Sequence, residues 1–400
     1  MRRRFQQVGL SLVSLALFLG LAEAVARCSL TDAYYVWPPN FEEDFDPDPT
    51  IIHGITGTSR LTINSMGIRG DPFAEEQRYR LLAVGGSTTI CTYLDDTETW
   101  PYLVQERLNA SLGSGTTWVG NVGRPGHASS QHLLQVTELL RQHPEIDGVL
   151  LLVGINDFLV TLNFLERPWR LASSRYDLLK SAFSIFPGWD EGAPWYRRTA
   201  LGRPRWRVPE WIENRPAQDR QGRSVARWRA YRREASALRA DLPDLSGPLI
   251  SYTRQLDAII DAAEAEDARV IFMTQPTLWR PGLSQAELDL LWTGGPREKS
   301  GDEYYSVEAL AVGMKLYNDA LRRVCRDRET ECIDVAARLP KEPAVFWDDA
   351  HFTEEGARRV AEIVAGTLLE REPLAGLRRL DGEEPRRGAD RIHRRAAAPE

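Results

Sequence analysis

Lysine is scarce in this 400-residue chain, which takes nearly all of its positive charge from arginine. The lysines stand only at positions 180, 299, 315 and 341. The formal net charge is −7 at pH 7. A protein that binds nucleic acid normally carries a basic patch for the phosphates. The charge balance therefore argues against a nucleic-acid partner, and we interpret the arginine content as a compositional bias.

Cysteine is also scarce, and its spacing excludes two kinds of site. The four cysteines are Cys28, Cys91, Cys325 and Cys332, and no two of them form a CxxC pair. Zinc ribbons and thioredoxin-like redox sites are therefore unsupported. The chain also lacks a P-loop, a GxGxxG turn and an HExxH helix. The sequence implies no metal and no organic cofactor.

The N-terminus has a basic start followed by an apolar run. Residues 1–4 read Met-Arg-Arg-Arg, and apolar residues extend from Val8 to Ala22. This order is typical of an export signal, with a cytoplasmic N-terminus and an exported body. The run is short for a spanning helix, which needs ~20 apolar residues. Residues 1–28 are thus either a signal peptide cleaved near Ala22-Glu23-Ala24 or an uncleaved membrane anchor, which we favour.

The rest of the chain alternates between short apolar runs and helical patterns. We predict strands at 79–84, 118–122, 148–153, 269–274 and 332–335. We predict helices at 100–108, 129–142, 248–265 and 307–324, and a closing helix capped by Thr353. Strands that alternate with helices form parallel sheets with helices on both faces. The expected fold is α/β, a flavodoxin-like three-layer sandwich with about five parallel strands.

Three segments fall outside this alternation. Residues 29–75 are rich in Pro, Asp, Gly and Thr, and we expect a lead-in that lies on the surface of a main domain at 76–375. Residues 160–246 hold six tryptophans and are interpreted as an insertion, not as a second catalytic domain; these are Trp169, Trp189, Trp195, Trp206, Trp211 and Trp228. Residues 376–400 are predicted to be a disordered charged tail.

Polar residues stand where three of the predicted strands end. The first strand is followed by Gly85-Gly86-Ser87, the second leads to Gly126, and the third leads to Asn156. Binding sites of doubly wound sheets form at the carboxyl ends of the strands. Far downstream, Asp348 and His351 lie three residues apart, so a single turn can bring their side chains together.

These residue types fit nucleophilic catalysis. A serine hydroxyl needs a base, for which histidine has a suitable pKa. The histidine needs an acidic partner that fixes its tautomer and stabilises its protonated form. The oxyanion of the intermediate needs hydrogen-bond donors, which a glycine N–H and an asparagine amide can supply.

The segments resemble the four signature blocks of the SGNH (GDSL-like) hydrolases, in the same order, and the resemblance spans about residues 60–370. Residues 64–70, which read NSMGIRG, are similar to a lead-in of many bacterial members, and we place the chain in a membrane-anchored bacterial branch. The resemblance implies that Ser87 is the nucleophile, His351 the base and Asp348 its partner. It further implies an oxyanion hole made by the N–H of Ser87, the N–H of Gly126 and the amide of Asn156.

Some assignments have alternatives within the chain. Gly123 competes with Gly126, and Asp349 competes with Asp348, although the three-residue spacing favours Asp348. The nucleophile block reads GGST where the strict family pattern is GDS, and Thr89 prevents a GxSxG elbow. The remaining histidines are expected to be surface or loop residues, with His127 beside the glycine block the one worth testing; they are His53, His127, His132, His143 and His393.

The resemblance implies a serine esterase of the cell envelope, anchored or secreted, that hydrolyses an acyl or acetyl ester of a small molecule or a glycan. One alternative is an O-acyltransferase of envelope glycans, in which an alcohol replaces water. Another is a non-catalytic envelope-binding protein of the same fold, against which the intact set of site residues speaks. Fold and triad do not fix the acyl group or the alcohol.

Two further expectations concern structure. The insertion begins just after Asn156, at the carboxyl edge of the sheet, so we expect it to form a wall or lid of the site with some of its tryptophans. Disulfides persist in exported proteins, and the polar loop 326–331 suits a bridge between Cys325 and Cys332. Cys28 and Cys91 are expected to stay unpaired.

Overall fold

The structure is a computed structural model, and it describes residues 2–28, 33–166, 175–187, 219–296, 298–371 and 373–374. Several predictions for the insertion and the tail lie outside these residues: five of the six tryptophans, Trp169, Trp189, Trp195, Trp206 and Trp211, and the tail at 376–400. His393 lies outside them as well.

A five-stranded parallel sheet forms the centre of the fold. Its strands are β3 (Tyr79–Gly85), β4 (Thr117–Asn121), β5 (Gly148–Leu152), β7 (Arg269–Met273) and β9 (Glu331–Ile333). They lie in the order β4-β3-β5-β7-β9, and every neighbouring pair is parallel. Numbered along the chain this order is 2-1-3-4-5, the flavodoxin-like arrangement. The predicted fold class is confirmed.

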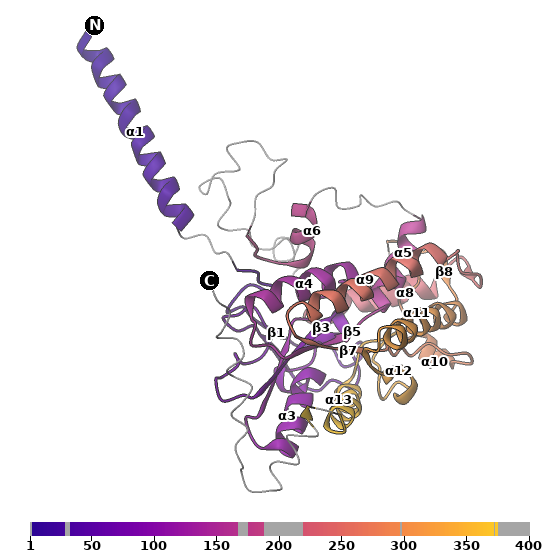
Figure 1. The fold of residues 1–400 in the computed structure, drawn as a ribbon. Helices are drawn as coiled ribbons and strands as arrows, with labels where there is room; N and C mark the ends of the chain where they lie inside the picture. The colour runs from indigo at the N-terminus through magenta and orange to yellow at the C-terminus, as the bar shows by residue number, and fades with distance from the viewer. Residues whose placement is uncertain are drawn as a thin grey trace, which may run out of the picture.

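Helices cover both faces of this sheet (Figure 1). On one face α4 (Ser129–Gln142) packs along α9 (Ser246–Glu264), and α11 (Val307–Asp327) packs on α9 and on α5 (Ile155–Glu166). On the other face α3 (Trp100–Leu112) packs along α13 (Glu354–Leu369). Because both faces are covered, β5 is buried along its whole length, as its sequence Gly-Val-Leu-Leu-Leu requires.

The predicted helix and strand positions are confirmed to within a few residues, and so is the predicted cap. The side-chain oxygen of Thr353 accepts a hydrogen bond from the N–H of Gly356 at 3.0 Å. The short elements are α2 (Ser87–Ile90), the 3-10 helix η1 (Asp96–Glu98), α10 (Gln285–Leu288) and α12 (Val335–Arg338).

Residues 33–75, the described part of the lead-in, contribute buried side chains to the core, which corrects the predicted surface position of this segment. It forms an antiparallel pair of strands, β1 (Glu42–Phe45) and β2 (Ser59–Thr62), and it buries Trp37, Ile52 and Ile68. The apolar residues are spread between turns, and each strand is only four residues long, so no periodic pattern marked them.

The described parts of the insertion are also integrated into the fold. Its first residues, 160–166, continue helix α5, and it further contributes α6 (Arg175–Ala182) and α8 (Arg223–Arg233). The short strand β6 (Leu238–Arg239) pairs in parallel with β8 (Tyr304–Tyr305).

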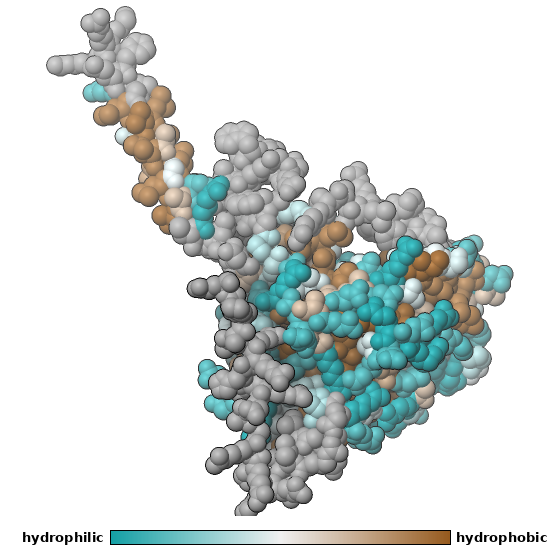
Figure 2. Space-filling model, viewed as in Figure 1, coloured by the Kyte–Doolittle hydropathy of each residue, from teal (hydrophilic) through white to brown (hydrophobic). Residues whose placement is uncertain are grey.

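The N-terminal helix α1 (Arg2–Cys28) extends away from the rest of the chain (Figure 1). Its stretch Leu10–Arg27 is long and apolar enough to cross a membrane, and its apolar side chains are exposed (Figure 2). A helix of this kind at an N-terminus is a signal sequence or an anchor.

The predicted disulfide is absent. Cys325 at the end of α11 and Cys332 in β9 are free thiols that share a hydrogen bond, which raises the pKa of Cys325. The loop thus brings the two side chains together as expected, but the sulfur atoms are not bonded. Cys91 is free and buried, and burial raises the pKa of its thiol to about 12, so this thiol is un-ionised and inert at neutral pH.

Candidate active site

The candidate site lies at the carboxyl ends of β3 and β5, the two strands between which the order of the sheet reverses. β4 lies on one side of β3 and β5 on the other, so the connections after β3 and β5 diverge and leave a crevice. Ser87 follows β3 through Gly86, and Asn156 follows β5 through Gly154. The strand ends therefore place two of the predicted residues side by side.

The loop before α13 brings Asp348 and His351 to Ser87. The Nε2 atom of His351 is 2.8 Å from the Oγ atom of Ser87, and its Nδ1 atom is 2.7 Å from the Oδ2 atom of Asp348. The other carboxylate oxygen of Asp348 accepts the backbone N–H groups of Ala350 and His351 at 2.9 and 2.8 Å. The turn between them therefore fixes the carboxylate against the imidazole ring.

Asp348 is fully buried, whereas 22% of the His351 side chain is exposed. Burial opposes ionisation of Asp348. The charge of His351 and the hydrogen bonds from the His351 ring and from the N–H groups of Ala350 and His351 outweigh this effect and lower the pKa of the carboxyl. Asp348 is therefore an ionised partner that can stabilise a protonated imidazole.

Asp349, the alternative to Asp348, points away from His351. Its carboxylate accepts the indole N–H of Trp279 at 2.8 Å, the hydroxyl of Thr293 at 2.7 Å and the backbone N–H of Trp292 at 2.9 Å. Burial and then the charge of Asp348 raise the pKa of Asp349. Donors surround it nonetheless, so we assign it a structural role as a hydrogen-bond acceptor.

The geometry also distinguishes Gly126 from Gly123, the other candidate for the oxyanion-hole glycine. The N–H of Gly123 is occupied by the side chain of Asn121 at 2.9 Å, and a Cβ atom at Gly123 would lie 2.3 Å from the backbone nitrogen of Ile90. Gly126 instead lines the cavity beside Ser87, with a φ of +80° that favours glycine. Gly126 is thus the glycine in a position to donate to a ligand.

Asn156 lines the same cavity and holds the glycine loop. Its Nδ2 atom donates to the carbonyl of His127 at 2.7 Å, which leaves its second amide hydrogen for a ligand. Gly86 lies close behind, since a Cβ atom there would be 2.4 Å from that nitrogen. Gly86, the second glycine of the GGST block, therefore leaves space for the amide of Asn156.

The family profile described as GDSL-like lipase/acylhydrolase matches residues 83–359, most of the chain. The chain belongs to the GDSL-like lipase/acylhydrolase family. A search of curated proteins found no match.

Among solved structures the chain is similar to TesA, at 15% identity and a TM-score of 0.39, covering 74% of this chain and 99% of that one. It is similar to the psychrotrophic esterase EstA from Pseudoalteromonas sp., at 12% identity and a TM-score of 0.36, covering 73% and 97%. It is also similar to a catalytic mutant of an acetylxylan esterase from Geobacillus stearothermophilus, at 12% identity and a TM-score of 0.37, covering 74% and 94%.

In this member of the GDSL-like family a cavity of about 370 Å³ opens beside Ser87. Its walls are largely apolar and include Leu159 and Val160 of α5 and Val225 and Trp228 of α8, so the insertion contributes one side as expected. The indole rings of Trp292 and Trp347 complete the wall nearest His351; the Trp347 ring stacks on the imidazole with ring centroids 4.9 Å apart.

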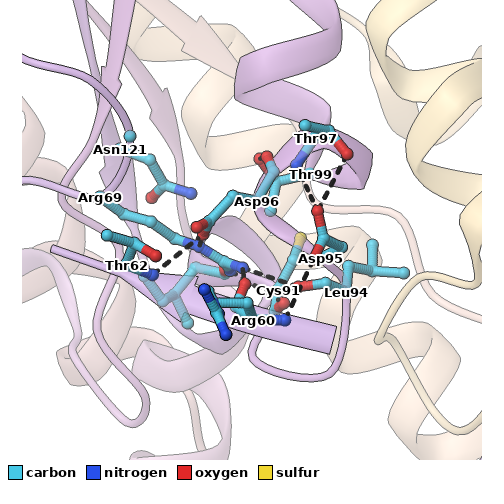
Figure 3. A network of polar contacts seen from close by, with 12 residues as sticks. Arg60, Thr62, Arg69, Cys91, Leu94, Asp95, Asp96, Thr97, Thr99 and Asn121 are labelled. Carbon is cyan, nitrogen blue, oxygen red and sulfur yellow. Dashed lines mark hydrogen bonds and ion pairs between the residues drawn. The ribbon is translucent and has the colours of Figure 1, made fainter. Parts of the chain in front are cut away.

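The chain that follows Ser87 is held by a buried arginine that sequence reasoning missed. Arg69 donates to the carbonyls of Ile90, Cys91, Leu94 and Arg60 and forms an ion pair with Asp96 at 2.6 Å (Figure 3). Its side chain is only 2% exposed. Since residues 91–94 line the cavity, Arg69 shapes one wall of the site.

The signal for Arg69 was present in the NSMGIRG segment. The side chain of Asn64 accepts the N–H of Met66 at 2.8 Å and donates to the carbonyl of Gly70 at 3.0 Å, which closes the segment into a turn. Gly67 has a φ of +73° and lies so close to the carbonyl of Trp37 that a Cβ atom would be 2.7 Å away. The turn formed by this motif therefore places the Arg69 side chain in its buried position.

His127 and His132 are buried, which corrects their predicted surface or loop positions. Burial lowers the pKa of His127, and it lowers the pKa of His132 to about 4, so both rings are neutral near pH 7. The Nδ1 atom of His127 is hydrogen-bonded to Gln135 at 3.0 Å. His127 thus acts through its carbonyl, which orients Asn156. Among the described residues, no three His, Cys, Asp or Glu side chains gather to hold a metal ion.

Proposed function

We propose that this protein is a serine esterase that hydrolyses carboxylic esters through an acyl-enzyme on Ser87. The observation that carries the proposal is the unbroken hydrogen-bonded series from Ser87 to His351 to Asp348 at the floor of a cavity. A nucleophile in contact with a base, itself oriented by a buried carboxylate, is the arrangement of acyl transfer.

In the first step the Oγ atom of Ser87 attacks the ester carbonyl carbon while the Nε2 atom of His351 takes its proton. The tetrahedral oxyanion is held by the N–H groups of Ser87 and Gly126 and by the amide of Asn156. The intermediate collapses as the C–O bond to the alcohol breaks, and His351 returns the proton to the leaving oxygen. Asp348 stabilises the imidazolium between these two transfers.

In the second step water replaces the alcohol. His351 takes a proton from the water as its oxygen attacks the acyl carbon. The second tetrahedral intermediate then collapses: the bond between the acyl carbon and the Oγ atom of Ser87 breaks, His351 returns the proton to Oγ, and the acid is released. An alcohol in place of water would give acyl transfer, which a product dependent on the acceptor would reveal.

The proposal is tested with p-nitrophenyl esters of graded chain length and with a fluorophosphonate that labels an activated serine. Ser87→Ala and His351→Ala should each lower turnover by at least ~10⁴-fold, because the two side chains act as a unit. His53→Ala is the control, since His53 does not line the cavity. Substantial turnover or labelling in Ser87→Ala would contradict the mechanism.

The same assay has a pH arm. Only neutral His351 can accept the proton of Ser87, so turnover should rise with pH through the range in which histidine deprotonates. A flat profile from acid to neutral pH, with the chemical step limiting, would remove His351 as the base.

We propose further that α1 attaches the enzyme to the cell envelope with the hydrolase domain on the exported side. The apolar, exposed surface of α1 and the arginines at its start support this placement.

A further inference from the structure

Trp292 makes a contact with the carboxylate of Asp348 that no sequence motif announced. Its indole N–H donates to the Oδ2 atom of Asp348 at 2.6 Å. The same oxygen atom receives the Nδ1 atom of His351 at 2.7 Å. The indole and imidazole planes are nearly parallel, 8° apart, with ring centroids separated by 6.2 Å. Trp292 and His351 therefore share one acceptor.

Trp292 is held in this position from its own backbone. Its N–H donates to Asp349, and the hydroxyl of Thr293 donates to the same carboxylate. Arg232 of α8 fixes the next carbonyl, that of Thr293, at 2.5 Å. Two consecutive aspartates thus bind Trp292: Asp349 accepts its backbone N–H, and Asp348 accepts its indole N–H.

We propose that Trp292 is a positioning residue of the triad: its indole N–H fixes the Asp348 carboxylate and weakens the attraction of that carboxylate for the protonated form of His351. The inference rests on the proposed function. Asp348 has four hydrogen-bond donors, which divide between its two oxygen atoms. Two backbone N–H groups bind Oδ1, whereas His351 and Trp292 bind Oδ2.

The sign of the effect follows from the charges around the carboxylate. A hydrogen bond to an ionised carboxylate spreads its negative charge and stabilises the ionised form. The other groups that face Asp348 are His351, Asp349, Tyr93 and Arg229, and Arg232 acts on it through Asp349. None of these changes when only the indole N–H is removed. Asp348 then attracts the imidazolium more strongly, so His351 holds its proton to higher pH.

The test variant is Trp292→Phe, which keeps an aromatic ring but has no N–H. For hydrolysis of p-nitrophenyl acetate, the pH midpoint of kcat/KM should rise by roughly one unit, a change of about tenfold in the protonation equilibrium. Activity should therefore fall most below the midpoint and recover at alkaline pH.

The matched control is Trp118→Phe, which also removes a buried indole N–H, but one that donates to the backbone carbonyl of Asp71 and does not line the cavity. Its pH midpoint should stay where it is in the unsubstituted enzyme. An unchanged midpoint in Trp292→Phe, or the same shift in both variants, would overturn the inference.

A second measurement does not depend on a substitution at Trp292. In the intact enzyme, one indole ¹⁵N–¹H resonance should titrate with the same midpoint as activity, and this titration should vanish in His351→Ala. The absence of any such resonance would also overturn the inference. If the fluorophosphonate fails to label Ser87 in the unsubstituted enzyme, the proposed function fails instead, so the two failures are distinguishable.

Discussion

Asn156 holds the glycine loop through its amide and, in the proposed mechanism, binds the oxyanion with the same group, so a substitution there should show both effects. Asn156→Ala should cost ~2.7–4 kcal/mol of transition-state stabilisation, the effect of losing one oxyanion donor. It also frees the carbonyl of His127, so the glycine loop loses an anchor. We expect kcat for p-nitrophenyl acetate to fall about 10²- to 10³-fold with a small change in KM.

The control is Asn109→Ala on α3, because that asparagine binds the backbone of Thr117 far from the cavity. Asn109→Ala should lower the free energy of unfolding while leaving kcat intact. Equal kcat values for Asn156→Ala and the unsubstituted enzyme would exclude Asn156 from the oxyanion hole.

Arg69 supports the site through the carbonyls of Ile90, Cys91, Leu94 and Arg60. Arg69→Met should lower the free energy of unfolding by about 3 kcal/mol, since these carbonyls lose a charged donor and Asp96 loses its ion pair. The exposed Arg60–Asp44 pair provides the comparison, because Arg60→Met should lower the free energy of unfolding far less. Urea unfolding measures both; a similar small loss in the two variants would refute the supporting role.

The predictability of these residues differs for a physical reason. Ser87 and Asn156 stand in short local patterns at strand ends, and the Asp348–His351 turn stands in one just before a helix, so the sequence itself reports the geometry. Trp292 and Arg69 bind partners distant in the chain, and several of those partners are backbone carbonyls, which any residue possesses. No spacing rule could reveal such contacts before the fold was known.

Helix α8 joins the insertion to the site, and its inward face should influence substrate choice. Val225→Ala and Trp228→Ala enlarge the cavity, so kcat/KM for a long-chain p-nitrophenyl ester should rise about tenfold relative to the acetate. Labelling by a small fluorophosphonate should hardly change, because Ser87 and His351 are untouched.

Arg227→Ala on the exposed side of the same helix is the matched control and should leave the preference unaltered. If the two cavity variants keep the ester preference of the unsubstituted enzyme, the insertion does not act as a wall for the substrate.

At the level of elements, the sequence predicted the central sheet and its long helices because their apolar runs are continuous or strongly periodic. It failed at the lead-in, where β1 and β2 are too short for a pattern. It also did not predict α5, and it placed the start of the insertion at residue 160, inside that helix. The sequence correctly predicted that Cys325 and Cys332 lie close together, but the disulfide predicted between them is absent.

Across the whole molecule, α1 stands apart from the hydrolase domain, so the two should separate without loss of activity. A chain that lacks residues 1–28 should be soluble and keep the kcat/KM of the full chain for p-nitrophenyl acetate. The full chain should stay in the membrane fraction after a carbonate wash. An envelope protein whose N-terminus begins near Ala24 would instead identify α1 as a cleaved signal.

The distance along the chain between Ser87 and His351 has a consequence for biosynthesis. The two residues are 264 positions apart, and four of the five strands of the central sheet are synthesised between them. The proposed nucleophile therefore leaves the ribosome long before its base does. If Ser87 and His351 act as proposed, a nascent or prematurely terminated chain that ends before Asp348 should carry no esterase activity, however much of it has already folded. On the proposed mechanism, the chain gains activity only once the loop before α13 has been synthesised and has folded against Ser87.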